Sequence, residues 1–388
     1  MATAQSSAWS DLRPELLDIV LHRLHSLADR IRFRAVCRPW RHIALAQPLP
    51  PLMPWLALGN GDFLIIPDGE IHRMDVPDNA CCHGSCDNWL FVVHDNGLCS
   101  LMNPFTKASV QLPSLPKVAP HNELLSDAKF HMTVVPPASL NSPSDLLAAV
   151  LIRDFRDTLF SFCQPLINSG SFNGCRQGML ISGIAFCHGK LYVANPDFML
   201  YKFDLAVSSG GNRYSSMKKM TLLREELQIW PQDIPLSKED YHIIRRYLVE
   251  CDGRLLLVRR RMQIRPFAKC DDLLETACTC WFDVFEADFT VQPCQWRRLN
   301  TLGRRALFIG KYCSKSVSSE ECEEVKEDSI YFMCDYVKSD QSVDPLRDSG
   351  VFNMKTGAIT PLLSRTNAAL PRHFGRWCLS WFFPSEAR

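Results

Sequence analysis

The 388-residue sequence has no long apolar run and almost no net charge, and we expect no secretory leader. No stretch approaches about 18 uninterrupted apolar residues, so we expect no membrane-spanning helix. The opening residues MATAQSSAW carry no basic region ahead of an apolar run, which argues against secretion. The formal net charge of +1 gives no overall attraction to nucleic acid or to an anionic membrane. We therefore expect a protein of the cytoplasm or the nucleus.

Common catalytic motifs are also lacking. The sequence contains no G-x-S-x-G elbow, no phosphate-binding loop and no H-E-x-x-H, and its G-x-G pair, Gly59 and Gly61, lacks the third glycine of a dinucleotide fingerprint. We predict no catalytic residues, no cofactor and no enzymatic activity.

Cysteine, in contrast, is abundant, with 17 residues. Without a secretory leader we expect a reducing compartment, in which free cysteine packs as a small apolar side chain. The tightest groups are Cys81, Cys82 and Cys86, and Cys278 with Cys280. Neither group has the paired C-x-x-C spacing of a tetrahedral zinc site, so we predict no metal.

Residues 9–47 carry the strongest helical pattern, after a small polar tail at 1–8 that we expect to be disordered. Pro14 stands where a first helical residue needs no N–H, and apolar residues follow at helical spacing. Ser26 with Asp29 indicates the start of a second helix, and Pro39 that of a third. A domain of three short helices buries too little surface for independent stability. Its apolar surface should therefore meet another molecule or the remainder of the chain.

A proline-rich segment, PLPPLMP at 48–54, separates these helices from the larger C-terminal region. Such a segment is typical of a stiff spacer, which favours contact with another molecule.

The segments DLRPELLDIVLHRL and ADRIRFRAVCRPWR resemble the F-box of plant F-box proteins. The resemblance implies that residues 9–47 bind a Skp-type adaptor, which connects to the cullin and RING subunits of an SCF-type ubiquitin ligase. Family members usually have Leu-Pro at the start, whereas here Arg13 stands between leucine and proline. The adaptor-facing or core positions that the resemblance implies are Leu12, Pro14, Leu16, Leu17, Ile19, Val20, Leu24, Val36, Cys37 and Trp40.

Five arginines fall within twelve residues of this segment: Arg30, Arg32, Arg34, Arg38 and Arg41. They fit a solvated basic face, or a surface that steers the chain toward an acidic adaptor. A nucleic-acid patch is a third interpretation, but no basic or aromatic pattern continues beyond them.

From residue 55 to 384 the pattern becomes that of β-hairpins. A first phrase recurs at 82–84, 187–189 and 251–253, where a polar residue and glycine indicate a tight turn before a strand. A second phrase with Asn or Asp follows at 101–104, 201–205, 281–284 and 351–357. Residues 144–164 contain a hidden copy. Repeated small sheets favour a β-propeller over a sandwich, and roughly 45–55 residues per blade predict six or seven blades.

This region resembles the propeller-like domain that follows the F-box in a large plant family, domain of unknown function 295, close to kelch-type F-box proteins. The phrases NPFTKASVQLPSLP, DSIYFMCD and SGVFNMKTGAI carry the resemblance. By analogy with closed propellers, the final WCLSWFF segment is expected to pair with the first blade.

Three segments depart from the hairpin pattern. Residues 208–227 indicate a flexible loop ending in a short helix. Residues 320–328 hold six acids and predict a solvated loop, with a contact to a basic substrate as the alternative. Arg259 to Arg261 fit a strand end or blade edge protected by charge.

The predicted function is therefore a substrate receptor of an SCF-type ubiquitin ligase, with the propeller holding an unidentified protein target. An alternative is a scaffold protein with a degenerate F-box, for which Arg13 is the visible sign. A propeller hydrolase or lectin-like binder is the third hypothesis, because propellers also host active sites.

Overall fold

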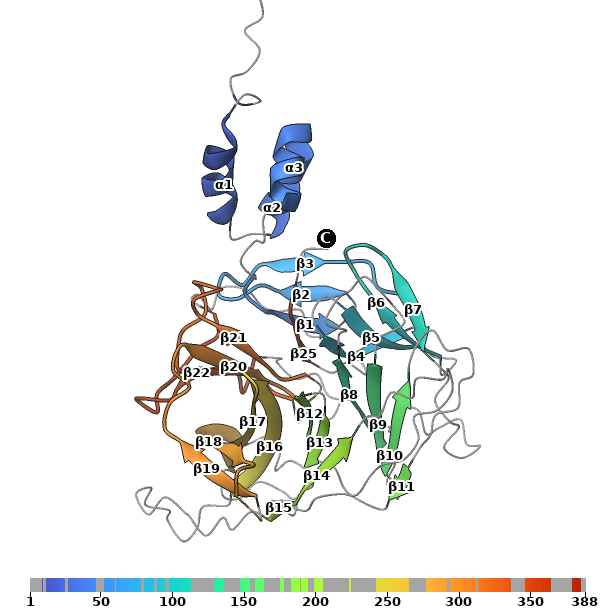
Figure 1. Cartoon of the computed structure of the whole chain (residues 1–388), viewed down its shortest axis with the longest axis vertical. Helices are drawn as coiled ribbons and strands as arrows, with labels where there is room; N and C mark the ends of the chain where they lie inside the picture. The colour runs from blue at the N-terminus through green and yellow to red at the C-terminus, as the bar shows by residue number, and fades with distance from the viewer. Residues whose placement is uncertain are drawn as a thin grey trace, which may run out of the picture.

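The computed structural model places three helices against a ring of β-sheets (Figure 1). The residues that it describes are 9, 12–24, 27–46, 52–59, 61–77, 80–86, 89–94, 98–112, 129–135, 147–153, 158–163, 175–177, 183–188, 190–194, 199–204, 223–224, 242–264, 277–291, 294–311, 313–335, 346–363 and 379–384.

The helices are α1 (Pro14–His22), α2 (Leu27–Val36) and α3 (Arg38–Ala46). As predicted, α1 begins at Pro14, and Glu15 in its first turn is favoured by the helix dipole. The predicted capping residue Ser26 lies outside the described residues. A small apolar core joins the three helices, made of Leu17, Leu21, Phe33 and Ala44.

The described strands form six sheets, which we call A to F in chain order. In bonding order, sheet A contains β25 (Ser380–Phe382), β1 (Trp55–Gly59), β2 (Asp62–Leu64) and β3 (Ile71–Arg73). Sheet B contains β4 (Ala80–Cys86), β5 (Trp89–His94), β6 (Cys99–Met102) and β7 (Ser109–Leu112). Sheet C contains β11 (Cys175–Gln177), β10 (Thr158–Cys163), β9 (Leu147–Arg153) and β8 (Lys129–Val135).

Sheet D contains β12 (Gly183–Cys187), β13 (Lys190–Ala194), β14 (Met199–Asp204) and β15 (Leu223–Arg224). Sheet E contains β16 (His242–Cys251), β17 (Arg254–Gln263), β18 (Cys278–Asp288) and β19 (Gln295–Leu299). Sheet F contains β21 (Lys315–Ser318), β20 (Arg305–Ile309), β22 (Ser329–Phe332), β23 (Gly350–Asn353) and β24 (Ile359–Thr360). The strands β9 and β10 confirm the hidden copy at 144–164.

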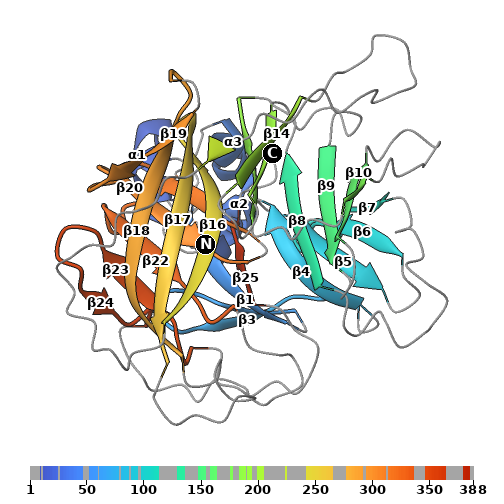
Figure 2. The ribbon, with the colours of Figure 1, turned by 90° about the horizontal axis from the view of Figure 1, so that it is seen from below.

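The sheets follow one another around a ring, which is the arrangement of a β-propeller (Figures 1 and 2). Shared apolar clusters join sheet A to B, D to E, E to F, and F back to A. The strand β8 of sheet C lies beside β4 and β12.

The end of the described chain closes the ring. The last strand, β25, pairs antiparallel with β1, and Trp55 lies opposite Phe382. Trp381 is fully buried, and its Nε1 donates a hydrogen bond to the backbone oxygen of Ile309 in sheet F, 2.8 Å away. The predicted pairing of the final WCLSWFF segment with the first sheet is thus confirmed for residues 380–382.

The first recurring phrase forms tight turns at two of its three places. His188 and Asp252 both have positive φ angles, 50° and 51°, and each stands between two paired strands. At 82–84 the prediction is wrong, because these residues lie inside β4 and a register shift occurs there between Cys82 and Gly84. The polar residue and glycine at 82–84 therefore mark the extra residue of a β-bulge and not a turn between strands.

The second phrase marks a turn where asparagine ends a strand. The Oδ1 atoms of Asn103 and Asn353 each accept hydrogen bonds from the backbone N–H groups two and three residues later. At 281–284 the prediction of a turn is wrong, because Asp283 lies in the middle of β18. A buried ion pair, described below, accounts for that aspartate.

Two further segments differ from expectation. The predicted helix at the end of 208–227 is not found in its described part, Leu223–Arg224, which is a strand. The acidic segment 320–328 is only partly solvated, because Cys322 and Val325 are buried in the cluster between sheets A and F. The predicted spacer 48–54 is described from residue 52 onward, where Leu52 and Met53 are buried among residues of the β-sheets.

Candidate functional site

The three helices expose an unusual amount of apolar surface for their size. Exposed apolar side chains on and beside them are Trp9, Leu16, Ile19, Val20, Val36 and Leu45, with exposed fractions of 39% to 65%. Soluble proteins seldom leave such a group of large apolar residues in contact with water unless a partner covers it. This surface is therefore the first candidate functional site.

The ten residues that the sequence singled out divide into three groups. Leu17 is fully buried in the helical core, and Leu12, Leu24, Cys37 and Trp40 are half-buried. The exposed ones are Pro14, Leu16, Ile19, Val20 and Val36. Only this last group is available as it stands for contact with another molecule.

Trp40 is held in place by the helical domain itself. Its ring lies 4.5 Å from that of Phe33, and its Nε1 donates to the backbone oxygen of Trp9 at 3.1 Å. Trp9 and Leu45, both exposed, extend the apolar surface and were not predicted from the sequence. Helical spacing gave no signal for Leu45, because it follows the exposed Arg41 by one turn of α3 and so shares a face with a charged residue.

The arginines of this segment do not act as one basic face. Arg30 is buried, with 3% exposed, and its Nε donates to the backbone oxygen of Leu24 at 2.7 Å. Arg32 is exposed and pairs with Asp29 at 2.8 Å. Arg38 and Arg41 are exposed as well, so a basic surface for steering a partner is smaller than the sequence indicates.

Arg30 also connects the helices to the propeller. Burial lowers the pKa of its guanidinium, and the nearby Cys322 and Glu324 of the acidic segment act in the opposite direction. The acidic segment between β21 and β22 therefore lies near Arg30 of α2, and the helical domain lies on one side of the ring (Figure 1).

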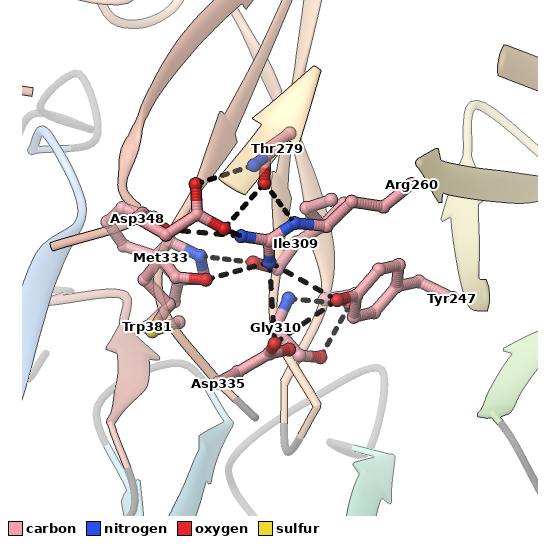
Figure 3. A network of polar contacts seen from close by, with 10 residues as sticks. Tyr247, Arg260, Thr279, Ile309, Gly310, Met333, Asp335, Asp348 and Trp381 are labelled. Carbon is pink, nitrogen blue, oxygen red and sulfur yellow. Dashed lines mark hydrogen bonds and ion pairs between the residues drawn. The ribbon is translucent and has the colours of Figure 1, made fainter. Parts of the chain in front are cut away.

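A second candidate site is a buried polar network around Arg260, in the middle of β17 (Figure 3). The guanidinium is completely buried and donates to Asp348 Oδ2 at 2.7 Å and to the backbone oxygen of Met333 at 2.8 Å. Its Nε donates to Thr279 at 2.7 Å, and Asp335 lies 3.4 Å from Nη1. The network joins the middle of sheet E to the segments that flank β22 and β23.

The electrostatics of this network are balanced. Burial alone lowers the pKa of Arg260, but its interactions with Tyr247, Asp335 and Asp348 outweigh burial and raise that pKa above its ordinary value. Burial, followed by the charge of Asp335, raises the pKa of Tyr247. Both shifts favour a charged guanidinium beside a protonated phenol, the pairing in which each buried group keeps its hydrogen bonds. The arrangement is structural.

A third arginine cluster lies on the other side of sheet E. Arg259, Arg261 and Arg298 all donate to the buried carboxylate of Asp283, at 2.8, 3.2 and 3.1 Å. Arg259 also lies over the ring of Phe285, 5.1 Å from its centroid. The prediction that Arg259 to Arg261 protect a strand end is therefore wrong, because all three are buried mid-strand and pair with carboxylates.

Other chemistry finds little support in the described residues. They contain no group of three or more His, Cys, Asp or Glu side chains placed to hold a metal ion. Burial raises the pKa of the Cys187 and Cys294 thiols to about 11. Such thiols are poor nucleophiles at neutral pH. No helix of the described segments has the length and apolar character needed to cross a membrane.

Comparison with known proteins gives a coherent result. The model of the KIB1-4 β-propeller matches residues 63–353. Two proteins of Arabidopsis thaliana that carry the name F-box protein are each 22% identical to this chain. One is matched over 383 residues, 92% of this chain and 90% of the relative, and the other over 357 residues, 85% and 97%. A third, also 22% identical, covers 84% of this chain and 86% of its own length.

Proposed function

Because the chain belongs to the KIB1-4 β-propeller family, we propose that it is the substrate-recognition subunit of an SCF-type ubiquitin ligase. Residues 9–47 would act as an F-box that binds a Skp-type adaptor, and through it the cullin and RING subunits. The propeller would hold a protein target, and each of sheets A to F would be one blade of a six-bladed, kelch-like ring. The chain would work in the cytoplasm or the nucleus and carry out no chemistry itself.

The observation that carries the proposal is the exposed apolar face of α1. Leu17 and Leu21 are fully buried in the helical core, whereas Leu16, Ile19 and Val20 are 42%, 51% and 39% exposed. One helix therefore presents two apolar faces, of which the fold covers only one. The names of the relatives, which give them as F-box proteins, support an adaptor as the molecule that covers the second.

The contact between α2 and the acidic segment supports a rigid receptor. A ligase receptor raises the effective concentration of its target near the transferring enzyme, and a fixed connection keeps the two within reach. Buried Arg30, with Glu324 nearby, supports such a connection.

The proposal is tested by pull-down of the purified chain with a plant Skp-type adaptor. Leu16→Asp places a charge in the proposed interface and is expected to weaken binding at least about 30-fold, the loss typical of an anchor residue. Arg23→Asp is the matched control, because it introduces the same residue at an exposed position beyond the end of α1. Binding by neither wild type nor control, or equal binding by all three proteins, would overturn the adaptor assignment.

The alternative of a scaffold with a degenerate F-box is favoured by one observation. Arg13 occupies the N-cap of α1, is exposed and makes no side-chain capping hydrogen bond there. Affinity purification from plant cells separates the two functions, because the ligase subunit recovers cullin together with the adaptor and the scaffold does not. Arg13→Leu should then increase cullin recovery if the arginine is what weakens the interface.

A further inference from the structure

A shallow groove lies where the outer strands of sheet E meet the turn that follows β23. Its volume is about 450 Å³, and Trp281, Asp283, Arg298, Asn300, Thr301 and Lys355 are among the residues that line it. No part of the proposed adaptor surface contributes to this groove. It is therefore available to a different ligand.

Both cations of the groove can reach a ligand. Lys355 is exposed, and within the described residues its ammonium group makes no hydrogen bond or ion pair. The Arg298 side chain is 37% exposed and uses Nη2 to donate to Asp283. The side chain also lines the groove.

The carboxylates of the groove, in contrast, are already engaged by the protein. Asp283 is 1% exposed and receives hydrogen bonds from three arginines. Asp328 uses Oδ1 to accept the backbone N–H of Leu302 at 2.6 Å. The carboxylate of Asp283 therefore offers little to a ligand, and the cationic side chains that line the groove, Arg298 and Lys355, are the groups that can attract an anion.

Trp281 forms part of the wall of the groove. The indole packs edge-on against Phe352, and the absence of a side chain at Gly357 leaves room for it, because a Cβ there would overlap the ring. Its Nε1 is inaccessible to water, so the ring gives the groove an apolar surface and no hydrogen bond.

We propose that this groove binds an acidic side chain of the target polypeptide, with Arg298 and Lys355 as its cationic contacts. The assignment rests on the proposed function, since it presumes that the propeller holds a target. Asn300 and Thr301 add neutral hydrogen-bonding groups at the rim, and the apolar ring of Trp281 forms part of the wall. Recognition of acidic motifs by arginine clusters is a common mode of peptide binding.

The test uses the full chain on arrays of immobilised random peptides that share one fixed residue: Glu, phosphoserine, Gln or Lys. The Glu array is expected to retain at least about fivefold more wild-type protein than the Gln array, and this preference should fall as the salt concentration rises. A still stronger signal on phosphoserine supports the same site and shows that the natural anion is a phosphoryl group. Equal retention on Glu and Gln arrays overturns the proposal.

Variants link the preference to the groove. Lys355→Glu alters an exposed turn residue that bonds only through its backbone, and is expected to reverse the preference from Glu to Lys. Arg298→Ala should reduce it at least threefold, whereas Arg297→Ala, its exposed neighbour outside the groove, should leave it unchanged. An unaltered preference in both groove variants would contradict the assignment. Adaptor pull-down with the same variants separates this site from the F-box. The groove variants should bind as much adaptor as wild type does, whatever their retention on the peptide arrays.

Discussion

Replacement of Asp348 by alanine tests whether the Arg260 network stabilises the propeller. The substitution removes the carboxylate 2.7 Å from Arg260 Nη2 and leaves a guanidinium with no exposed surface. It also removes the acceptor of the Thr279 backbone N–H at 2.9 Å. Loss of one partner from a buried ion pair costs about 3–5 kcal/mol, because the other charge stays buried. Asp335 remains at 3.4 Å and keeps the loss within this range.

Thermal unfolding followed by tryptophan fluorescence measures the loss. At roughly 2 °C per kcal/mol for a domain of this size, Asp348→Ala should lower Tm by about 6–10 °C. The control is Glu320→Ala, which breaks an ion pair to Arg304 whose side chains are 59% and 74% exposed. That substitution should lower the free energy of unfolding by at most about 1 kcal/mol. If the two variants melt together, the buried network does not contribute the stability assigned to it.

Three other changes test the fold. Gly357→Ala should destabilise the chain more than Gly303→Ala in urea unfolding, because both have positive φ but only the first would contact Trp281; equal losses would contradict this packing. Trp381→Ala should cost about 3–5 kcal/mol in the same assay, since its fully buried ring closes sheet A onto sheet F, and a loss below about 1 kcal/mol would argue against closure. Burial raises the pKa of Cys187 to about 11, so the unfolded thiol, with its ordinary pKa of 9, ionises first. This thiol's contribution to the free energy of unfolding is therefore present below pH 9 and lost between pH 9 and 11. Alkylation by iodoacetamide at about pH 8.5 checks the burial. If native Cys187 reacts as fast as the urea-unfolded thiol, the thiol is not buried.

Sequence reasoning succeeded where the signal is local. Pro14 marks the start of α1 because its ring suits a first helical position. The turns at His188 and Asp252 need positive φ, which few residues tolerate, so their sequence is distinctive. The asparagine turns at Asn103 and Asn353 are equally local, since each side chain binds the backbone within three residues.

It failed where a residue's role depends on partners far along the chain. Three consecutive arginines suggest an exposed edge, yet Arg260 bonds groups 73 and 88 residues away. Likewise, nothing in the acidic segment distinguishes the buried Cys322 and Val325 from a solvated loop. Within α1, helical spacing identified the apolar residues but could not divide them between the core and the exposed face.

The pairing of β25 with β1 also orders events during synthesis. Sheet A receives one of its strands from residues 380–382, so the ring cannot close until these residues have left the ribosome. The helices at 14–46 emerge first, and at about 5–20 residues per second they are exposed to the cell for tens of seconds before closure. A partner of the helices can therefore dock on a nascent chain whose β domain is still open, and a ribosome that stops early releases the helices without a finished ring.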